Sequence, residues 1–270
     1  MLFLLLVAGA VGGFIAGLVG VGGGVIFGPV LFFSYQAAGV EDPILTPLTL
    51  GTSLFCTFAA SASGTLGQRK AGAVDGRTAL VVGALAAVAV VLAGRFVATQ
   101  PWYDKNVFQL VLGSVLVAVV VRMLTKRGVS NTLSTAGARR QPGALALTGT
   151  AAGALSALAG VGGGVVLVPA LNGLVRLPLK AAAGTSTAAI TIITAVGVVT
   201  YAVLGWGEPV PPGALGYVDG RAALALAIPA IVAARVGVAT AHRVDVRYVQ
   251  YSFAALAAAV SARLLWSALA

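Results

Sequence analysis

The chain has 270 residues, of which 59% are hydrophobic and 9% are charged, and its mean hydropathy is +1.01. A soluble globular domain carries about 25% charged residues, so this composition excludes a soluble protein and indicates a membrane protein with several spans. The net charge is +10, but the 17 Lys and Arg are scattered singly or in pairs along the chain, which excludes a basic arm or helix that binds nucleic acid.

Apolar runs bounded by charges, glycines and prolines predict ten helical segments. A helix needs about 20 apolar residues to cross the ~30 Å hydrocarbon core, and two of the runs are shorter, so they are either re-entrant or tightly fitted spans. A polar linker, 125–142, separates a first transmembrane repeat, 1–124, from a second one, 143–270. The segments are 1–20, 24–38, 46–67, 77–99, 105–124, 143–160, 164–175, 178–204, 217–239 and 246–268.

The two halves repeat each other, which indicates a duplication. Residues 17–31, GLVGVGGGVIFGPVL, match residues 157–171, ALAGVGGGVVLVPAL, at 9 of 15 positions without a gap. Two further motifs recur in the same order along the chain. They are Gly51-Thr52-Ser53 with Gly184-Thr185-Ser186, and Val74-Asp75-Gly76-Arg77 with Val218-Asp219-Gly220-Arg221.

The basic residues predict how the two halves are oriented. If each GVGGG only interrupts a helix that continues across the membrane, the two sides hold ten and seven Lys and Arg, which decides nothing. If each GVGGG reverses the chain, the halves are inverted and the sides hold thirteen and four; the four are Arg95, Lys105, Arg221 and Arg263. Since basic loops stay in the cytoplasm, we expect the inverted arrangement, in which the charges are unevenly divided. The chain is then expected to be an all-α polytopic protein of the cell (inner) membrane. It has two inverted five-segment repeats, each opening with a Gly-broken hairpin, with both termini outside and the linker cytoplasmic.

The triple glycines are the strongest candidates for a binding site. Each glycine weakens a helix by about 1 kcal/mol relative to alanine, and broken backbone inside a membrane must be buried or line a cavity. The short helix that follows each tract would direct its N-terminal N–H groups toward the bilayer middle, which suits an anion. The alternative is close helix packing, which we expect for Gly9, Gly13 and Gly17. The candidate residues are Gly22, Gly23, Gly24, Gly162, Gly163 and Gly164.

Hydroxyls near the starts of the next spans are a second candidate. Thr52, Ser53, Thr185 and Ser186 can complete the hydrogen-bond shell of an anion without adding charge, although such side chains also bond back to their own helix. The two Asp-Gly-Arg motifs are interpreted as helix starts capped by a carboxylate.

Few residues remain for other chemistry. The single cysteine, Cys56, excludes a disulfide framework, and we interpret it as a buried thiol rather than a ligand. His242 and seven scattered carboxylates form no metal-ligand cluster. We therefore expect no metal, no cofactor and no catalytic residue, and hence no enzyme.

The paired GVGGGxxxxP segments, the paired Gly-Thr-Ser and the paired Val-Asp-Gly-Arg resemble the TauE/SafE sulfite exporter family over nearly the whole chain. The resemblance implies transport of sulfur-containing or other organic anions. It assigns the motif positions to the two triple-glycine tracts with Pro29 and Pro169. The first repeat departs from the pattern, because Phe27 and Gly28 precede its proline.

Three functions are compared. A secondary carrier or exporter of a small anion in the lipid bilayer is favoured, because the breaks offer anion sites within an almost uncharged interior. A passive anion channel with the same site is the alternative, and a membrane assembly factor is a third hypothesis that the short loops disfavour. The sequence leaves open the anion, the direction of flow, a coupling ion (proton or sodium) and the oligomeric state.

Overall fold

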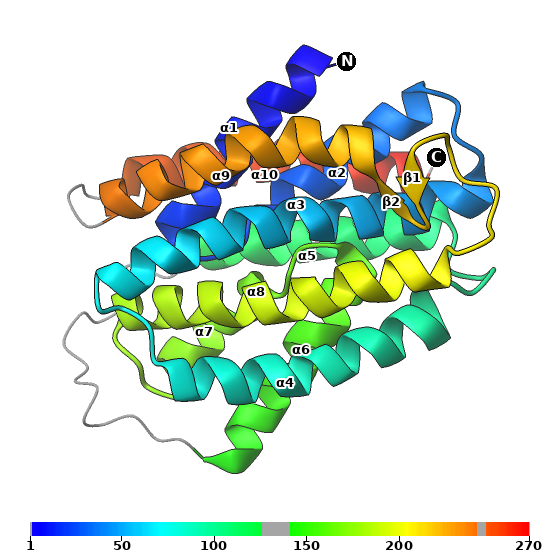
Figure 1. Cartoon of the computed structure of the whole chain (residues 1–270). Helices are drawn as coiled ribbons and strands as arrows, with labels where there is room; N and C mark the ends of the chain where they lie inside the picture. Colours follow the sequence, from blue (N-terminus) through cyan, green and yellow to red (C-terminus); the bar gives the residue numbers. More distant parts are fainter. Residues whose placement is uncertain (1, 126–140, 242–246, 270) are drawn as a thin grey trace.

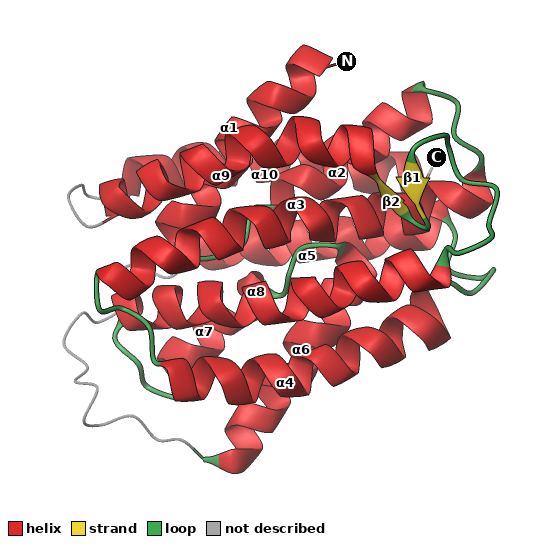
Figure 2. Cartoon of the chain, in the orientation of Figure 1, coloured by secondary structure: helices red, strands yellow, loops and turns green. Residues whose placement is uncertain are grey.

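The computed structural model describes residues 2–125, 141–241 and 247–269. These residues form ten α-helices, one π-helical turn and one two-stranded hairpin (Figure 1, Figure 2). The first half contains α1 (Leu2–Val19), α2 (Gly24–Ala37), α3 (Asp42–Lys70), α4 (Gly76–Ala93), η1 (Gly94–Ala98) and α5 (Lys105–Thr125). The second contains α6 (Pro142–Ala159), α7 (Gly164–Gly173), α8 (Leu179–Leu204), β1 (Ala214–Leu215), β2 (Val218–Asp219), α9 (Gly220–Ala241) and α10 (Arg247–Leu269).

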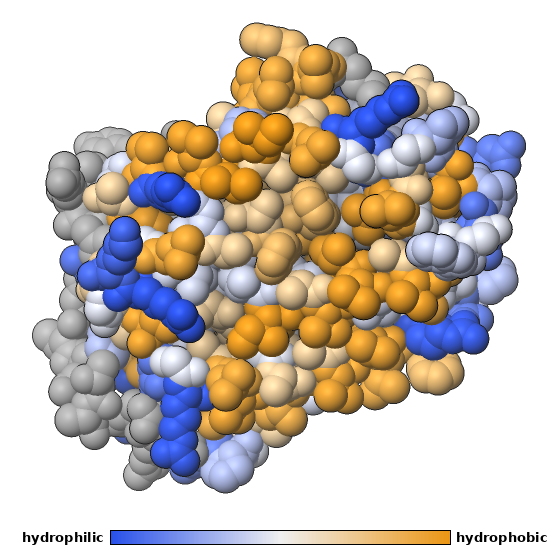
Figure 3. Space-filling model, viewed as in Figure 1, coloured by the Kyte–Doolittle hydropathy of each residue, from blue (hydrophilic) through white to orange (hydrophobic). Residues whose placement is uncertain are grey.

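The helices have the lengths and composition of a polytopic membrane protein, as predicted. Among the described residues, six are long and apolar enough to cross a bilayer: α1, α3, α4 with η1, α6, α8 and α9. The helices after the glycine tracts are short, with 14 residues in α2 and 10 in α7. Apolar side chains cover the middle of the face drawn in Figure 3, and hydrophilic residues gather toward its two ends.

Four helices form a layer in the order α9, α3, α8, α4, because α3 packs on both α9 and α8, and α4 packs on α8 (Figure 1). α1 packs along α9, α6 packs along α4, and α5 pairs with α10. Each helix of the first half has its counterpart five helices later, so α1 corresponds to α6 and α4 corresponds to α9. Exchanging counterparts turns the α1–α9 pair into α6–α4 and leaves the α3–α8 and α5–α10 pairs unchanged. The packing is therefore the same seen from either half.

Small residues bring α1 close to α9. A Cβ atom on Gly9, Gly13 or Gly17 would collide with the backbone of Leu226, Ala230 or Ala234, respectively. The prediction that this stripe serves close helix packing is confirmed.

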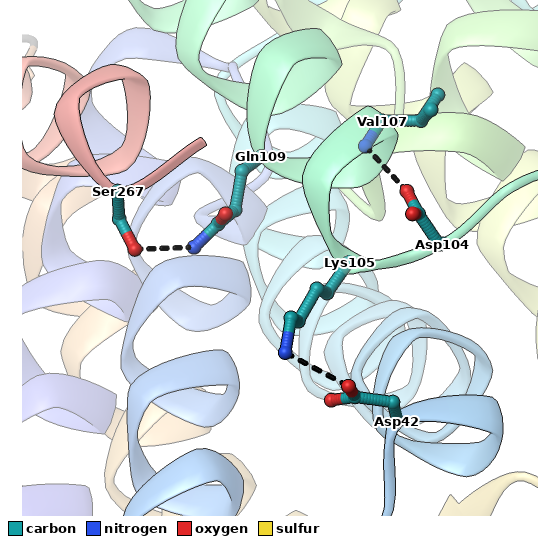
Figure 4. A network of polar contacts seen from close by, with 6 residues as sticks. All are labelled: Asp42, Asp104, Lys105, Val107, Gln109 and Ser267. Carbon is teal, nitrogen blue, oxygen red and sulfur yellow. Dashed lines mark hydrogen bonds and ion pairs between the residues drawn. The ribbon is translucent and has the colours of Figure 1, made fainter. Parts of the chain in front are cut away.

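The loops divide between two ends of the bundle. In Figure 1 the loops 71–75 and 174–178 lie at the left end, and 38–41, 99–104 and 205–219 lie at the right end. At the end with loops 38–41 and 99–104, Lys105 Nζ lies 2.8 Å from Asp42 Oδ2, and the Val107 N–H donates to Asp104 (Figure 4). A buried amide, that of Gln109, donates to Ser267 Oγ and joins α5 to α10 (Figure 4).

Three local features differ from the sequence prediction. α3 begins at Asp42 rather than at residue 46, because Pro43 lies in the first turn, where a helix tolerates proline. The hairpin β1–β2 precedes α9, which begins at Gly220; strands of two residues are too short to produce a periodic pattern. α4 continues into the π-helical turn η1, which carries Arg95.

Candidate functional site

Both glycine tracts break the helix, as predicted. The first break (residues 20–23) joins α1 to α2, and the second break (residues 160–163) joins α6 to α7. Six of their glycines have left-handed backbone, which a residue with a side chain rarely adopts. Their φ angles are +77° (Gly20), +95° (Gly22), +74° (Gly23), +67° (Gly160), +79° (Gly162) and +77° (Gly163).

The two breaks meet inside the bundle. A Cβ on Gly24, the first residue of α2, would lie 2.6 Å from the Gly160 carbonyl oxygen and 2.7 Å from Val161 Cα. A Cβ on Gly164, the first residue of α7, would lie 2.6 Å from Val21 Cα. Each short helix therefore begins against the break of the other half, and the glycines permit that approach.

The carbonyl ends of the broken helices are satisfied by side chains. At the end of α6, the Tyr201, Tyr103 and Ser53 hydroxyls donate to the carbonyls of residues 157, 158 and 160 at 2.7, 2.8 and 2.8 Å. At the end of α1, the Ser186 hydroxyl donates to Gly20 at 3.0 Å, and the Gln68 amide contacts the carbonyl of residue 17 at 3.5 Å. Burial raises the pKa of Tyr103, so its hydroxyl stays a protonated donor.

The N–H ends of the short helices have a different environment. Their N-cap residues are Gly23 and Gly163, which have no side chain to accept a hydrogen bond. The first N–H groups bonded within α2 are those of Ile26 and Phe27, which donate to the Gly23 carbonyl. A helix offers no internal acceptor to the N–H groups before these, and the dipole adds positive potential there. The starts of α2 and α7 therefore bring two positive dipole ends to the junction of the breaks, where residues 20–24 face residues 160–164.

The predicted hydroxyls divide into two pairs. Ser53 and Ser186 lie beside the breaks, but each donates its proton to a carbonyl of the other half. Thr52 accepts from the Asp219 N–H and Thr185 from the Asp75 N–H, both at 3.0 Å. The serines thus lie next to the glycine tracts, whereas the threonines connect the Gly-Thr-Ser motif of one half to the Val-Asp-Gly-Arg motif of the other.

The aspartates of that last motif cap helices, as predicted. The Asp75 carboxylate accepts from the N–H and hydroxyl of Thr78 at the start of α4. The Asp219 carboxylate accepts from the N–H groups of Arg221 and Ala222 at the start of α9. The Tyr35 hydroxyl also donates to Asp219, at 3.1 Å, so the end of α2 contacts this turn.

One residue at the junction is missing from the sequence prediction. Thr57 in α3 is fully buried, and its hydroxyl has no hydrogen-bond partner in the described part of the chain. This hydroxyl oxygen lies 2.8 Å from the Cβ position of Gly24. The repeat does not mark this position, because its counterpart in the second half is Ile190. Its place one turn after Ser53 on the same helix face was the available signal.

A cavity of about 480 Å³ lies at the end of α3 that carries Arg69 and Lys70. Thr65, Arg69 and Thr191 line it, together with the start of α4. The hydroxyl oxygens of Thr65 and Thr191 are 3.1 Å apart. Thr57, Ser61 and Thr65 follow one another at every fourth position, so hydroxyls line α3 from the junction to this cavity.

The remaining candidates have structural surroundings. Cys56 is buried, and its thiol contacts the Ala223 carbonyl at 3.8 Å. Within the described ranges, no group of three or more His, Cys, Asp and Glu lies together. His242 and residues 126–140 of the linker lie outside the described residues.

Comparison with known proteins gives one family. A family model described as "Sulfite exporter TauE/SafE" matches residues 5–264. A probable membrane transporter protein of Methanocaldococcus jannaschii is 26% identical over 250 residues, covering 93% of this chain and 90% of the relative. A probable membrane transporter protein of Haemophilus influenzae is 26% identical over 257 residues, covering 94% of each chain. No solved structure matches the chain.

Proposed function

Because the chain belongs to the TauE/SafE sulfite exporter family, whose members are membrane transporters, we propose that it is a secondary carrier of small anions. Its substrates are sulfur-containing oxyanions or organosulfonates. The anion binds near the bilayer midplane, to backbone N–H groups at the starts of α2 and α7.

The observation that carries this proposal is the contact between the two breaks. Gly24 lies against residues 160 and 161, and Gly164 lies against Val21, so two helix N-termini begin side by side. Side chains satisfy the carbonyls that end α1 and α6 but not the first N–H groups of α2 and α7. Oriented backbone N–H groups and helix dipoles bind anions without a charged side chain.

We also propose that the two halves are inverted copies, with the basic end of the bundle in the cytoplasm. The packing is the same seen from either half, and equivalent loops lie at opposite ends: 38–41 follows α2 at one end, and 174–178 follows α7 at the other (Figure 1). Arg69, Lys70, Arg176 and Lys180 belong to the end with loops 71–75 and 174–178. In such folds the halves rock against each other around a central site.

Flux in proteoliposomes tests the function. We expect sulfite or a small sulfonate to be taken up with saturation, and an internal load of the same anion to drive counterflow. Uptake that does not saturate and shows no counterflow would indicate a channel. Folded protein that moves none of these anions contradicts anion transport.

A further inference from the structure

The hydroxyl of Thr57 is in an unusual state for a threonine in a membrane helix, a state that among the buried threonines of the described residues it shares with Thr46 near the start of α3. Such a hydroxyl normally donates to the carbonyl four residues earlier. Among the described helices this bond, at 2.6–3.0 Å, is made by Thr49, Thr148, Thr150, Thr187, Thr191, Thr194, Thr200 and Thr240. Thr57 is fully buried and does not make it. An unpaired buried hydroxyl is destabilising, so this orientation needs a reason.

The Thr57 side chain lies at the junction of the breaks. Its methyl carbon is 3.1 Å from the Cβ position of Gly22 and 2.7 Å from that of Gly162, so it contacts both. Its hydroxyl oxygen is turned instead toward Gly24, at 2.8 Å from the Cβ position. The hydroxyl oxygen therefore lies beside Gly24, the first residue of α2, where the N-terminal N–H groups of that helix begin.

The second half has no equivalent hydroxyl. Ile190 occupies the matching position one turn after Ser186, and its side chain lies 3.2 Å and 3.0 Å from the Cβ positions of Gly22 and Gly162. The atoms nearest a Cβ on Gly164 all belong to the Val21 backbone. The junction thus has a polar wall toward α2 and an apolar wall formed by Ile190.

The immediate surroundings of the junction are uncharged. The side chains that contact the Cβ positions of Gly22, Gly24 and Gly162 are those of Thr57, Ile190 and Thr194. Hydrogen bonds and a helix dipole can stabilise one negative charge in such a place. The cost of moving an ion out of water grows with the square of its charge, so a second negative charge is strongly disfavoured.

We propose that the Thr57 hydroxyl donates a hydrogen bond to a singly charged oxyanion at the start of α2, and that this neutral, one-sided site selects monoanions over dianions. The inference rests on the proposed anion transport and deepens it. It explains why the Thr57 hydroxyl does not donate to the carbonyl four residues earlier in its helix: the hydroxyl is free to donate to the ligand.

Binding to the purified full chain tests the role of the hydroxyl. Methanesulfonate and sulfate are suitable probes, because they are similar in size and carry one and two charges. Thr57→Val keeps the shape of the side chain and removes the donor, and Thr57→Ser keeps the donor. The matched control is Thr194→Val, since Thr194 is equally buried near Gly162 but already donates to the Ile190 carbonyl at 2.7 Å.

We expect the wild type to bind methanesulfonate and to discriminate against sulfate. Thr57→Val should weaken methanesulfonate binding about tenfold to 150-fold, as for loss of a hydrogen bond to a charged group. Thr57→Ser and Thr194→Val should leave the affinity close to that of the wild type. Without anion, the Thr57→Val protein should be at least as stable as the wild type, because an unpaired buried hydroxyl has been removed.

Several outcomes would overturn the inference and leave the proposed function standing. One is that the wild type transports anions and the Thr57→Val protein binds methanesulfonate with the same affinity as the wild type. Another is a Thr57→Val protein that binds normally but has lost stability without anion, which would make the hydroxyl structural. A preference for sulfate would overturn the charge selection. If Thr57→Val does not fold, Thr57→Ala removes the same donor and is judged in the same way. A wild type that neither binds nor transports any of these anions would contradict the proposed function itself.

Discussion

Gly164→Ala tests whether the two breaks meet as the structure places them. Gly164 is the first residue of α7, and an added Cβ would lie 2.6 Å from Val21 Cα. Real Cβ atoms essentially never approach another heavy atom within 3.0 Å, and the Val21 carbonyl oxygen is nearer than Val21 Cα, so the breaks must separate by more than 0.4 Å. Since the obstructing atoms are backbone, the strain cannot be relieved by a rotamer change. We expect a loss of about 1–3 kcal/mol of stability, typical of overpacking.

The matched control is Gly28→Ala in α2. A Cβ on Gly28 would be 3.6 Å from its nearest neighbour, the Ala159 carbonyl oxygen, which is ordinary contact. Alanine in a helix interior is favoured over glycine by about 1 kcal/mol, so Gly28→Ala should be neutral or stabilising. The assay is thermal unfolding in detergent, followed by circular dichroism, together with anion flux in proteoliposomes. Equal stability and equal flux for the two variants would refute the contact between the breaks.

Three further predictions concern hydrogen bonds at the ends of helices. Ser53→Ala and Ser186→Ala should each lower the free energy of unfolding by about 1–3 kcal/mol, because each leaves a buried carbonyl without its donor. A loss confined to one of the two variants in unfolding assays would contradict their equivalent roles. Asp219→Ala should cost about 0.5–2 kcal/mol as a lost helix cap, whereas Asp219→Asn, which can still cap, should cost less; equal melting temperatures would argue against the cap. Burial raises the pKa of Tyr103, so the stability from its bond to Leu158 is present below the ordinary tyrosine pKa of about 10 and is lost as pH rises beyond it. Wild type and Tyr103→Phe should therefore differ at neutral pH and converge in strongly alkaline buffer, and a difference that widens there would contradict the assignment.

Features that depend on local sequence could be predicted. The apolar runs gave the helices to within a few residues, and the triple glycines marked both breaks, because left-handed backbone requires glycine there. The aspartate caps of α4 and α9 followed from Asp-Gly-Arg, since a carboxylate satisfies the first N–H groups of the helix. The stripe of Gly9, Gly13 and Gly17 predicted a close helix contact but not its partner, α9.

Features that depend on contacts between the halves could not be predicted. Nothing near Ser53 in the sequence shows that its hydroxyl donates to Gly160, more than a hundred residues away. The same holds for the bonds of Thr52 to Asp219 and of Thr185 to Asp75. Thr57 could not be predicted from the repeats either, because its counterpart in the second half is Ile190 and no repeated hydroxyl marks the position.

The location of the bound anion tests the central claim most directly. Crystals of the protein grown with selenite, whose selenium is located by anomalous diffraction, would reveal the site without assuming a residue. We predict a selenium peak at the junction of the breaks, within hydrogen-bonding distance of the Thr57 hydroxyl and the first residues of α2. A peak beside Arg95 or Arg221 in place of one at the junction would contradict the account, because guanidinium groups and not helix starts would then hold the anion.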